Sequence, residues 1–139
     1  MSGIRGKDTK PEIVVRRLLH GMGYRFRLHR KDLPGKPDIV LPKWRTVVFV
    51  NGCYWHGHSN CHLFRLPKSR TEFWTNKIDA NRQRDTRNHR QLADSGWKAV
   101  IVWECAVLKK NRLDDKMFKQ NFEQAILSPL IHIQIRGGA

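Results

Sequence analysis

Apolar residues recur at helical spacing near the start of the chain. Thr9-Lys10-Pro11-Glu12 has the features of a helix start: a hydroxyl at the cap, proline in the first turn, and glutamate three residues after the cap. The next apolar positions lie one, three or four residues apart: Val14, Val15, Leu18, Leu19 and Met22. Gly21 and Gly23 then break the pattern, so we predict a helix that ends there.

Shorter apolar runs predict strands. Residues 24–29 alternate apolar and basic side chains, which is typical of a half-buried strand. Residues 39–41 and 46–50 are two apolar runs separated by Pro42 and Lys43, and they predict adjacent strands. Residues 99–103 form a further apolar run and predict a buried strand.

Two later segments favour helices. Residues 71–95 form a long, highly charged segment ending at Gly96, and residues 114–127 are amphipathic. The tail after Pro129 gives no prediction. The resulting order is helix, three strands, helix, strand, helix, which indicates an α/β fold with a short central mixed β-sheet flanked by helices. No linker or repeat interrupts it, so we predict a single domain over residues 1–139.

Charge narrows the function. The chain has 27 Lys and Arg against 12 Asp and Glu, a formal charge of +15 and a pI near 10.5. A field of this size favours a polyanionic partner, and nucleic acid is a better interpretation than a merely basic surface. No apolar run is long enough to cross a bilayer and no secretory signal opens the chain. We therefore expect an intracellular, cytoplasmic protein.

All three cysteines can belong to one metal site. Cys53 and Cys61 lie in an irregular stretch, residues 51–61, and Cys105 follows the last predicted strand. A lone Cys105 would be interpreted as a small buried apolar residue. As a group, three thiols and one histidine complete the tetrahedral shell of Zn²⁺. With all four positions filled by protein, the zinc would be structural.

Two histidines compete for the fourth zinc position. If residues 54–58 are extended, His56 and His58 point to opposite sides of the chain. One can then bind zinc while the other faces a different site. Spacing alone leaves the choice open, because Cys53-x-x-His56 is also a plausible ligand pair.

Asp38 is one of only two acids between Ile13 and Thr71, and it begins an apolar strand. It is either a turn cap or the ligand of an oxygen-bound cation, since a carboxylate there is costly unless solvated or bound. Phosphodiester hydrolysis requires such a cation and a base that titrates near neutral pH, for which the imidazole of His56 is suited. Glu12 is either the capping-box residue or a second carboxylate at this site.

Five segments, taken together, resemble the very short patch repair endonucleases. Their order and spacing match over most of the chain, to about Leu108: residues 8–12, 33–38, 51–58, 70–74 and 96–105. The resemblance implies a restriction-endonuclease-like core. It also implies an enzyme that nicks one DNA strand just 5′ of the thymine in a T·G mismatch, which arises when 5-methylcytosine deaminates.

The resemblance also assigns roles at the catalytic centre. Asp38 would be the carboxylate ligand of Mg²⁺, assisted by the backbone carbonyl of Val50. His56 would be the base that activates water, and Glu12 would orient metal-bound water.

Two further groups follow from the same resemblance. The structural Zn²⁺ would be held by Cys53, His58, Cys61 and Cys105. An aromatic wedge would enter the duplex beside the mispair, where a flat ring can replace a lost base stack: Tyr54, Trp55 and Trp74. Packing of these rings over the zinc loop is the alternative interpretation.

The chain departs from some relatives at three positions. Val50 lacks a hydroxyl, Asn51 stands where some relatives have histidine, and Asn60 lengthens the gap between His58 and Cys61. Relatives usually have a further basic segment before the start of this chain.

Three functions remain to be distinguished. The first is a monomeric mismatch-nicking endonuclease acting on double-stranded DNA, with mismatch-repair factors as candidate partners. The second is a restriction-like nuclease with a different DNA target. The third is a non-catalytic, zinc-containing DNA-binding module, which would have no use for both Asp38 and His56.

Overall fold

The structure, a computed structural model, describes residues 9–53, 58, 68–108 and 112–137. Within them, five strands form one mixed sheet in the order β1-β2-β3-β4-β5, antiparallel from β1 to β3 and parallel from β3 to β5. The strands are β1 (Arg27–Leu28), β2 (Ile39–Leu41), β3 (Thr46–Asn51), β4 (Lys98–Trp103) and β5 (His132–Ile135). The predicted α/β class with a mixed central sheet is confirmed.

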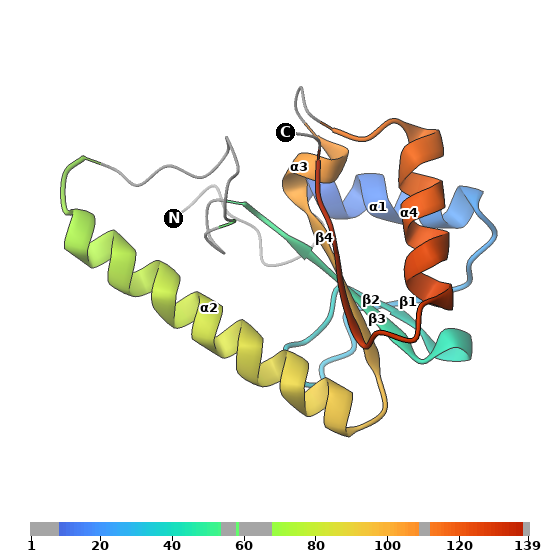
Figure 1. Cartoon of the computed structure of the whole chain (residues 1–139), viewed down its shortest axis with the longest axis horizontal. Coiled ribbons are helices and arrows are strands. Elements are labelled where there is room, and N and C mark those ends of the chain that lie inside the picture. Colours follow the sequence, from blue (N-terminus) through green and yellow to red (C-terminus); the bar gives the residue numbers. More distant parts are fainter. Residues whose placement is uncertain (1–8, 54–57, 59–67, 109–111, 138–139) are drawn as a thin grey trace.

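Helices cover both faces of this sheet (Figure 1). α1 (Lys10–Gly21) and α4 (Asp115–Leu127) lie on one side, and the 24-residue α2 (Thr71–Asp94) lies on the other. A short α3 (Glu104–Val107) follows β4, and a 3-10 turn (Pro42–Trp44) joins β2 to β3.

The strands alternate their side chains between the two helical layers. Val48 and Val50 of β3 belong to the apolar core with α1 and α4. Val47 and Phe49 belong to the core on the opposite face, which also contains Leu92 of α2. This two-residue period explains why residues 47–50 are uniformly apolar, since a strand covered on both faces has no solvent side.

The strand register brings the ends of β3 and β4 and the start of β2 to the same edge of the sheet. β3 and β4 are parallel, with Val50 opposite Val102 and Asn51 opposite Trp103, so both strands end at the same edge. β2 runs antiparallel to β3 and therefore begins there. The residue before β2, Asp38, donates its backbone N–H to the carbonyl of Val48 at 3.1 Å.

Most predicted elements are found close to their predicted bounds. The last helix begins one residue later than predicted because Asp114 is its N-cap, accepting the N–H of Met117 at 2.7 Å. The strand predicted at residues 24–29 is shorter, because only β1 pairs with β2. Tyr24 instead packs its ring against Phe122 and Trp44, at centroid distances of 5.4 and 6.0 Å.

β5 was not predicted, although its signal was available. Ile131, Ile133 and Ile135 alternate with His132 and Gln134, which is the two-residue period of an edge strand. No helix among the described residues is long and apolar enough to span a membrane.

Candidate active site and metal centre

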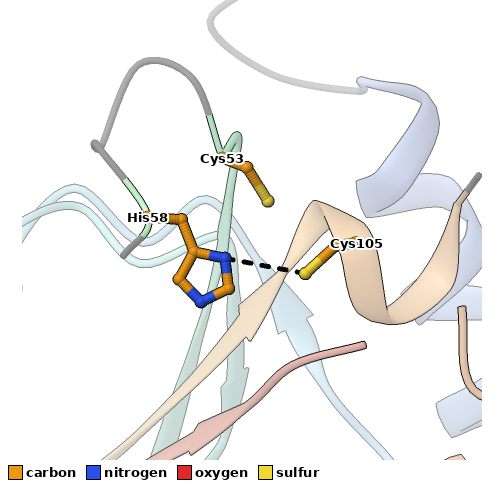
Figure 2. A group of neighbouring side chains, drawn as sticks. All are labelled: Cys53, His58 and Cys105. Atoms are coloured by element: carbon orange, nitrogen blue, oxygen red, sulfur yellow. Dashed lines mark hydrogen bonds between the residues drawn. The ribbon is translucent and has the colours of Figure 1, made fainter. Parts of the chain in front are cut away.

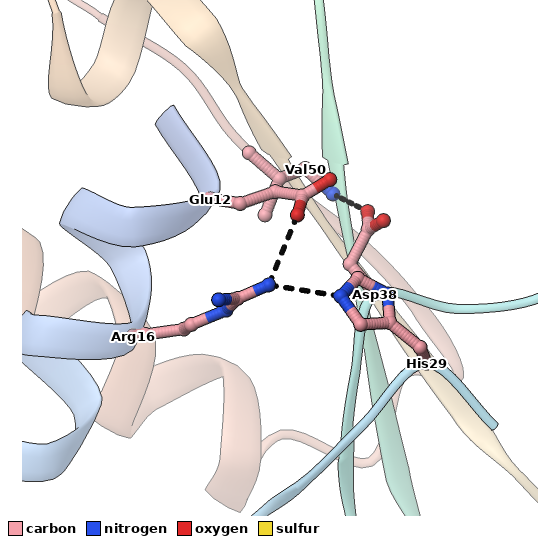
Figure 3. A network of polar contacts seen from close by, with 5 residues as sticks. All are labelled: Glu12, Arg16, His29, Asp38 and Val50. Atoms are coloured by element: carbon pink, nitrogen blue, oxygen red, sulfur yellow. Dashed lines mark hydrogen bonds and ion pairs between the residues drawn. The ribbon is translucent and has the colours of Figure 1, made fainter. Parts of the chain in front are cut away.

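Backbone contacts fix Asp38 at the sheet edge. Its carbonyl accepts the N–H of His29 at 3.2 Å, and its Oδ2 accepts the N–H of Val50 at 2.7 Å (Figure 3). In an extended strand, the N–H and C=O of one residue face the same neighbour. The Val50 carbonyl therefore faces the side of β3 on which Asp38 lies.

Glu12 reaches the same place from α1. Its side chain is 3% exposed, and its Oε2 accepts a hydrogen bond from Arg16 Nη2 at 3.2 Å. The nearest ligand atoms of Glu12, His29 and Asp38 all lie within 4.8 Å of one another. Thr9 makes no side-chain capping bond at the start of α1. The carboxyl group of Glu12 thus faces Asp38 and Arg16, as Figure 3 shows, which favours the site interpretation over the capping box.

The carboxyl group of Asp38 resists ionisation in this setting. Its pKa is raised to about 8, first by burial and then by the charge and hydrogen bond of Glu12, while the Val50 N–H and the Arg16 charge oppose the shift. Two carboxyl groups held this close repel each other when both are charged. An oxygen-binding divalent cation would relieve that repulsion, so the donor set fits a hard cation such as Mg²⁺.

A second cluster joins the ends of β3 and β4. Cys53 lies just after β3, and Cys105 lies in α3 just after β4. His58 Nδ1 is 3.6 Å from the Sγ of Cys105, and the ligand atoms of the three residues lie within 4.8 Å of one another (Figure 2). The structure thus brings together three of the four predicted zinc ligands, while Cys61 lies outside the described residues.

The chemistry of this cluster fits a thiolate-binding metal. His58 is 3% exposed and its ring stacks on Trp103 with centroids 3.9 Å apart. Burial lowers the pKa of His58, so its imidazole is held neutral, the form in which it binds metals. Its Nε2 is buried without a hydrogen-bond partner among the described residues. Neutral imidazole and two buried thiols are ligands that Zn²⁺ prefers.

Neighbouring groups hold both cysteines in position. The N–H of Cys53 donates to Glu104 Oε1 at 3.3 Å, and the N–H of Gly137 donates to the Sγ of Cys105 at 3.4 Å. N–H donors to sulfur stabilise a thiolate. The structure places His58 beside the two thiols, while His56 lies outside the described residues, so the assignment of His58 as the fourth ligand stays a prediction.

The predicted aromatic wedge is only partly described. Tyr54 and Trp55 lie outside the described residues, whereas Trp74 lies in the first turns of α2. Its ring is partly exposed and packs edge-on against Phe73, with centroids 5.2 Å apart. In Figure 1 this end of α2 extends beyond the sheet.

Sequence reasoning missed two residues of the carboxylate cluster. Arg16 lies four residues after Glu12 and forms the ion pair that this helical spacing favours. This contact could therefore have been predicted from the sequence. His29 lies near Asp38 only because β1 pairs with β2, a contact that no local pattern predicts.

Comparisons with known proteins agree with this geometry. Residues 1–62 match the sequence model of the family described as DNA mismatch endonuclease Vsr. The Type II nicking enzyme V.XorIIP of Xanthomonas oryzae pv. oryzae is 53% identical over 117 residues, covering 84% of this chain and 85% of that protein.

Two further relatives span similar lengths. The Type II nicking enzyme V.NmeAIP of Neisseria meningitidis is 48% identical over 110 residues, covering 79% of this chain and 78% of that protein. The DNA mismatch endonuclease Vsr of Escherichia coli is 42% identical over 126 residues, covering 91% of this chain and 80% of that protein. The chain therefore belongs to the Vsr family of DNA mismatch endonucleases.

Proposed function

We propose that this protein is a Mg²⁺-dependent endonuclease that nicks one strand of double-stranded DNA, just 5′ of the thymine in a T·G mismatch. The observation that carries the proposal is the pair formed by the buried Glu12 and the partly buried Asp38 at the end of β3, beside Val50. The relatives are nicking enzymes and a mismatch endonuclease by name, which supports the same reaction here. We propose that one nuclease domain spans the chain.

Each catalytic residue has a distinct task in this proposal. Asp38 and the carbonyl of Val50 would hold the cation, which when bound supplies Lewis acidity at the scissile phosphate. Glu12 accepts a hydrogen bond from the attacking water and orients it. We assign to His56 the removal of the proton from that water, since imidazole accepts a proton near neutral pH.

A structural Zn²⁺ would be the second metal. Cys53, His58 and Cys105 already converge, and Cys61 would complete the shell. Four protein ligands leave no open position for substrate, so this ion would stabilise the fold and take no part in hydrolysis.

The nicking assay tests the proposed function. The protein is incubated with Mg²⁺ and end-labelled duplexes that differ only in a T·G or a C·G pair, in several sequence contexts. We expect a single nick 5′ of the mispaired thymine. Equal cleavage of the paired duplex would favour a restriction-like nuclease with another target, and binding without any cleavage would favour a DNA-binding module.

Trp74→Ala should weaken binding to the T·G duplex by about 1–3 kcal/mol, the usual contribution of one base–aromatic stack. The loss should be smaller on the paired duplex, because a mispair is easier to unstack than a Watson–Crick pair. Dissociation constants at fixed salt measure both. Trp44→Ala is the matched control, since Trp44 is 41% exposed and lies in the turn between β2 and β3, at the opposite end of β3 from the site. Equal losses on both duplexes would contradict the wedge.

A further inference from the structure

His29 is held beside Asp38 by the backbone. It follows β1, its N–H donates to the carbonyl of Asp38, and its side chain is partly buried. Its φ angle is +54°, a left-handed conformation that is uncommon for residues other than glycine. Such a conformation persists where the surrounding structure enforces it. The position of the imidazole is therefore set by the pairing of β1 with β2.

The imidazole directs a lone pair into the carboxylate cluster. Nε2 of His29 lies 2.9 Å from Nη2 of Arg16 (Figure 3). Arginine remains protonated in proteins and only donates hydrogen bonds. Nε2 must therefore be the acceptor and the ring proton must lie on Nδ1. An unprotonated ring nitrogen is the form in which histidine binds a metal.

Arg16 already supplies positive charge to this cluster. The same Nη2 atom contacts Glu12 Oε2 at 3.2 Å and His29 Nε2 at 2.9 Å. One guanidinium nitrogen thus contacts two of the three potential ligands, which lie within 4.8 Å of each other and of the carboxylate of Asp38. Two cations cannot share these ligand atoms.

We propose that the His29 side chain binds the catalytic cation together with the Asp38 carboxylate and the Val50 carbonyl, and that Arg16 holds the cluster only until the cation displaces it. The inference rests on the proposed function, because it places the cation at Asp38. It adds a nitrogen ligand to a site that would otherwise contain only oxygen. Imidazole binds first-row transition metals better than Mg²⁺, so the site should prefer Mn²⁺ to a larger degree than carboxylates alone would.

The nature of the ligands can be measured without DNA or turnover. Mn²⁺ is added to the full-length, zinc-loaded protein, and electron spin echo spectroscopy detects nitrogen bound directly to it. We expect a ¹⁴N coupling in the parent protein and its loss in His29→Gln. His20→Gln is the matched control, since His20 is an exposed histidine at the end of α1. A parent spectrum without ¹⁴N coupling, or a coupling that persists in His29→Gln, would overturn the role of His29.

Titration with Mn²⁺ tests the displacement of Arg16. Arg16→Met keeps a long side chain and removes the charge, so Mn²⁺ should bind roughly tenfold more tightly, as expected when a competing charge is removed at this distance. Arg17→Met, on the exposed face of the same helix, should leave the affinity unchanged. If Arg16 instead supports the cation through Glu12, Arg16→Met will bind Mn²⁺ more weakly, and the displacement is wrong.

Asp38→Asn separates this inference from the proposed function. If Mn²⁺ binding is unchanged in Asp38→Asn, the cation does not bind at Asp38 and the proposed site is wrong. If binding is lost in Asp38→Asn while ¹⁴N coupling is absent in the parent, only the assignment of His29 fails. Arg16→Lys, which retains the charge, should bind Mn²⁺ with nearly the parent affinity. Arg16→Gln, which also removes the charge, replaces Arg16→Met if that variant does not fold, with the same tighter binding expected.

Discussion

Asp38→Asn should lower the rate of nicking at a T·G mismatch by about 10³-fold or more, while the affinity for that duplex stays within a few-fold of the parent value. Losses of 10²–10³ follow the removal of one electrostatic contact to a transition state, and loss of a cation ligand should exceed them. Asparagine has the same shape and its Oδ1 still accepts the N–H of Val50. The change thus removes the charge and leaves the backbone contacts. Single-turnover kinetics at saturating enzyme measure the chemical step.

Asp32→Asn is the matched control for this experiment. Asp32 is an exposed acid on the same turn, bonded to Arg30 at 2.6 Å, and it lies outside the carboxylate cluster. We expect it to nick at the parent rate. An equal loss of binding and of nicking in Asp38→Asn would indicate that Asp38 supports the structure of the binding surface and does not act in the reaction.

The stability of Asp38→Asn in buffer without added Mg²⁺ gives a second measurement. The pKa of Asp38 in the fold, about 8, lies above that of the unfolded chain, so the folded state binds more protons between about pH 4 and pH 8. The free energy of unfolding of the parent should therefore fall as the pH rises through that window. Asparagine does not titrate, so the variant should lack this part of the decline. A variant less stable than the parent at pH 8 would contradict this account.

Cys105→Ser should release the bound zinc and lower the melting temperature by about 10 °C or more. Structural zinc contributes its binding free energy to folding, and a few kcal/mol shifts the melting temperature of a domain this size by that amount. Cys105 is 2% exposed and within reach of Cys53 and His58, so its loss opens the centre of the cluster. Zinc content and thermal unfolding measure the two effects.

Chelation provides the control for this variant. A zinc chelator should lower the melting temperature of the parent to nearly that of Cys105→Ser, and it should leave the variant unchanged. If the chelator has no effect on the parent, the cluster is a packed group of thiols and the loss in Cys105→Ser reflects only a polar atom placed in the core.

Local patterns in the sequence predicted most helices and strands. They also predicted Asp38 in the carboxylate cluster and the cysteines in the second cluster. Three features depend only on neighbouring residues and could be interpreted from the sequence: the turn before Asp38, the apolar run of β3 and the helical spacing in α1. The three cysteines indicated a metal because two of them lie in one irregular segment with two histidines, which is the ligand type that Zn²⁺ prefers. Spacing alone left His56 and His58 as alternatives, because the proximity of the His58 ring to Cys105 depends on how the chain folds back onto α3.

The remaining features depend on contacts between distant segments. His29 contacts the site through the pairing of Arg27 with Val40, and nothing in residues 24–29 marks one histidine as special. The raised pKa of Asp38 depends on how deeply α1 buries it and on where Glu12 points. The position of His29 and the pKa of Asp38 both follow from tertiary packing, which the order of apolar and polar residues along the chain does not reveal.

The parallel pairing of β3 with β4 has a consequence for how the chain folds. Cys105 and His58 meet across 47 residues of sequence, which include the whole of α2. Parallel pairs of this kind form slowly, because closing a long segment costs entropy before any contact is gained. A permanent cross-link over that span would remove roughly 4 kcal/mol of chain entropy from the unfolded state. If Zn²⁺ binds these residues early in folding, as proposed, the crossover would be nearly closed before the sheet assembles. Under zinc shortage, cells would then lose yield of the enzyme to aggregation, while each molecule that folds with zinc bound would keep its full rate.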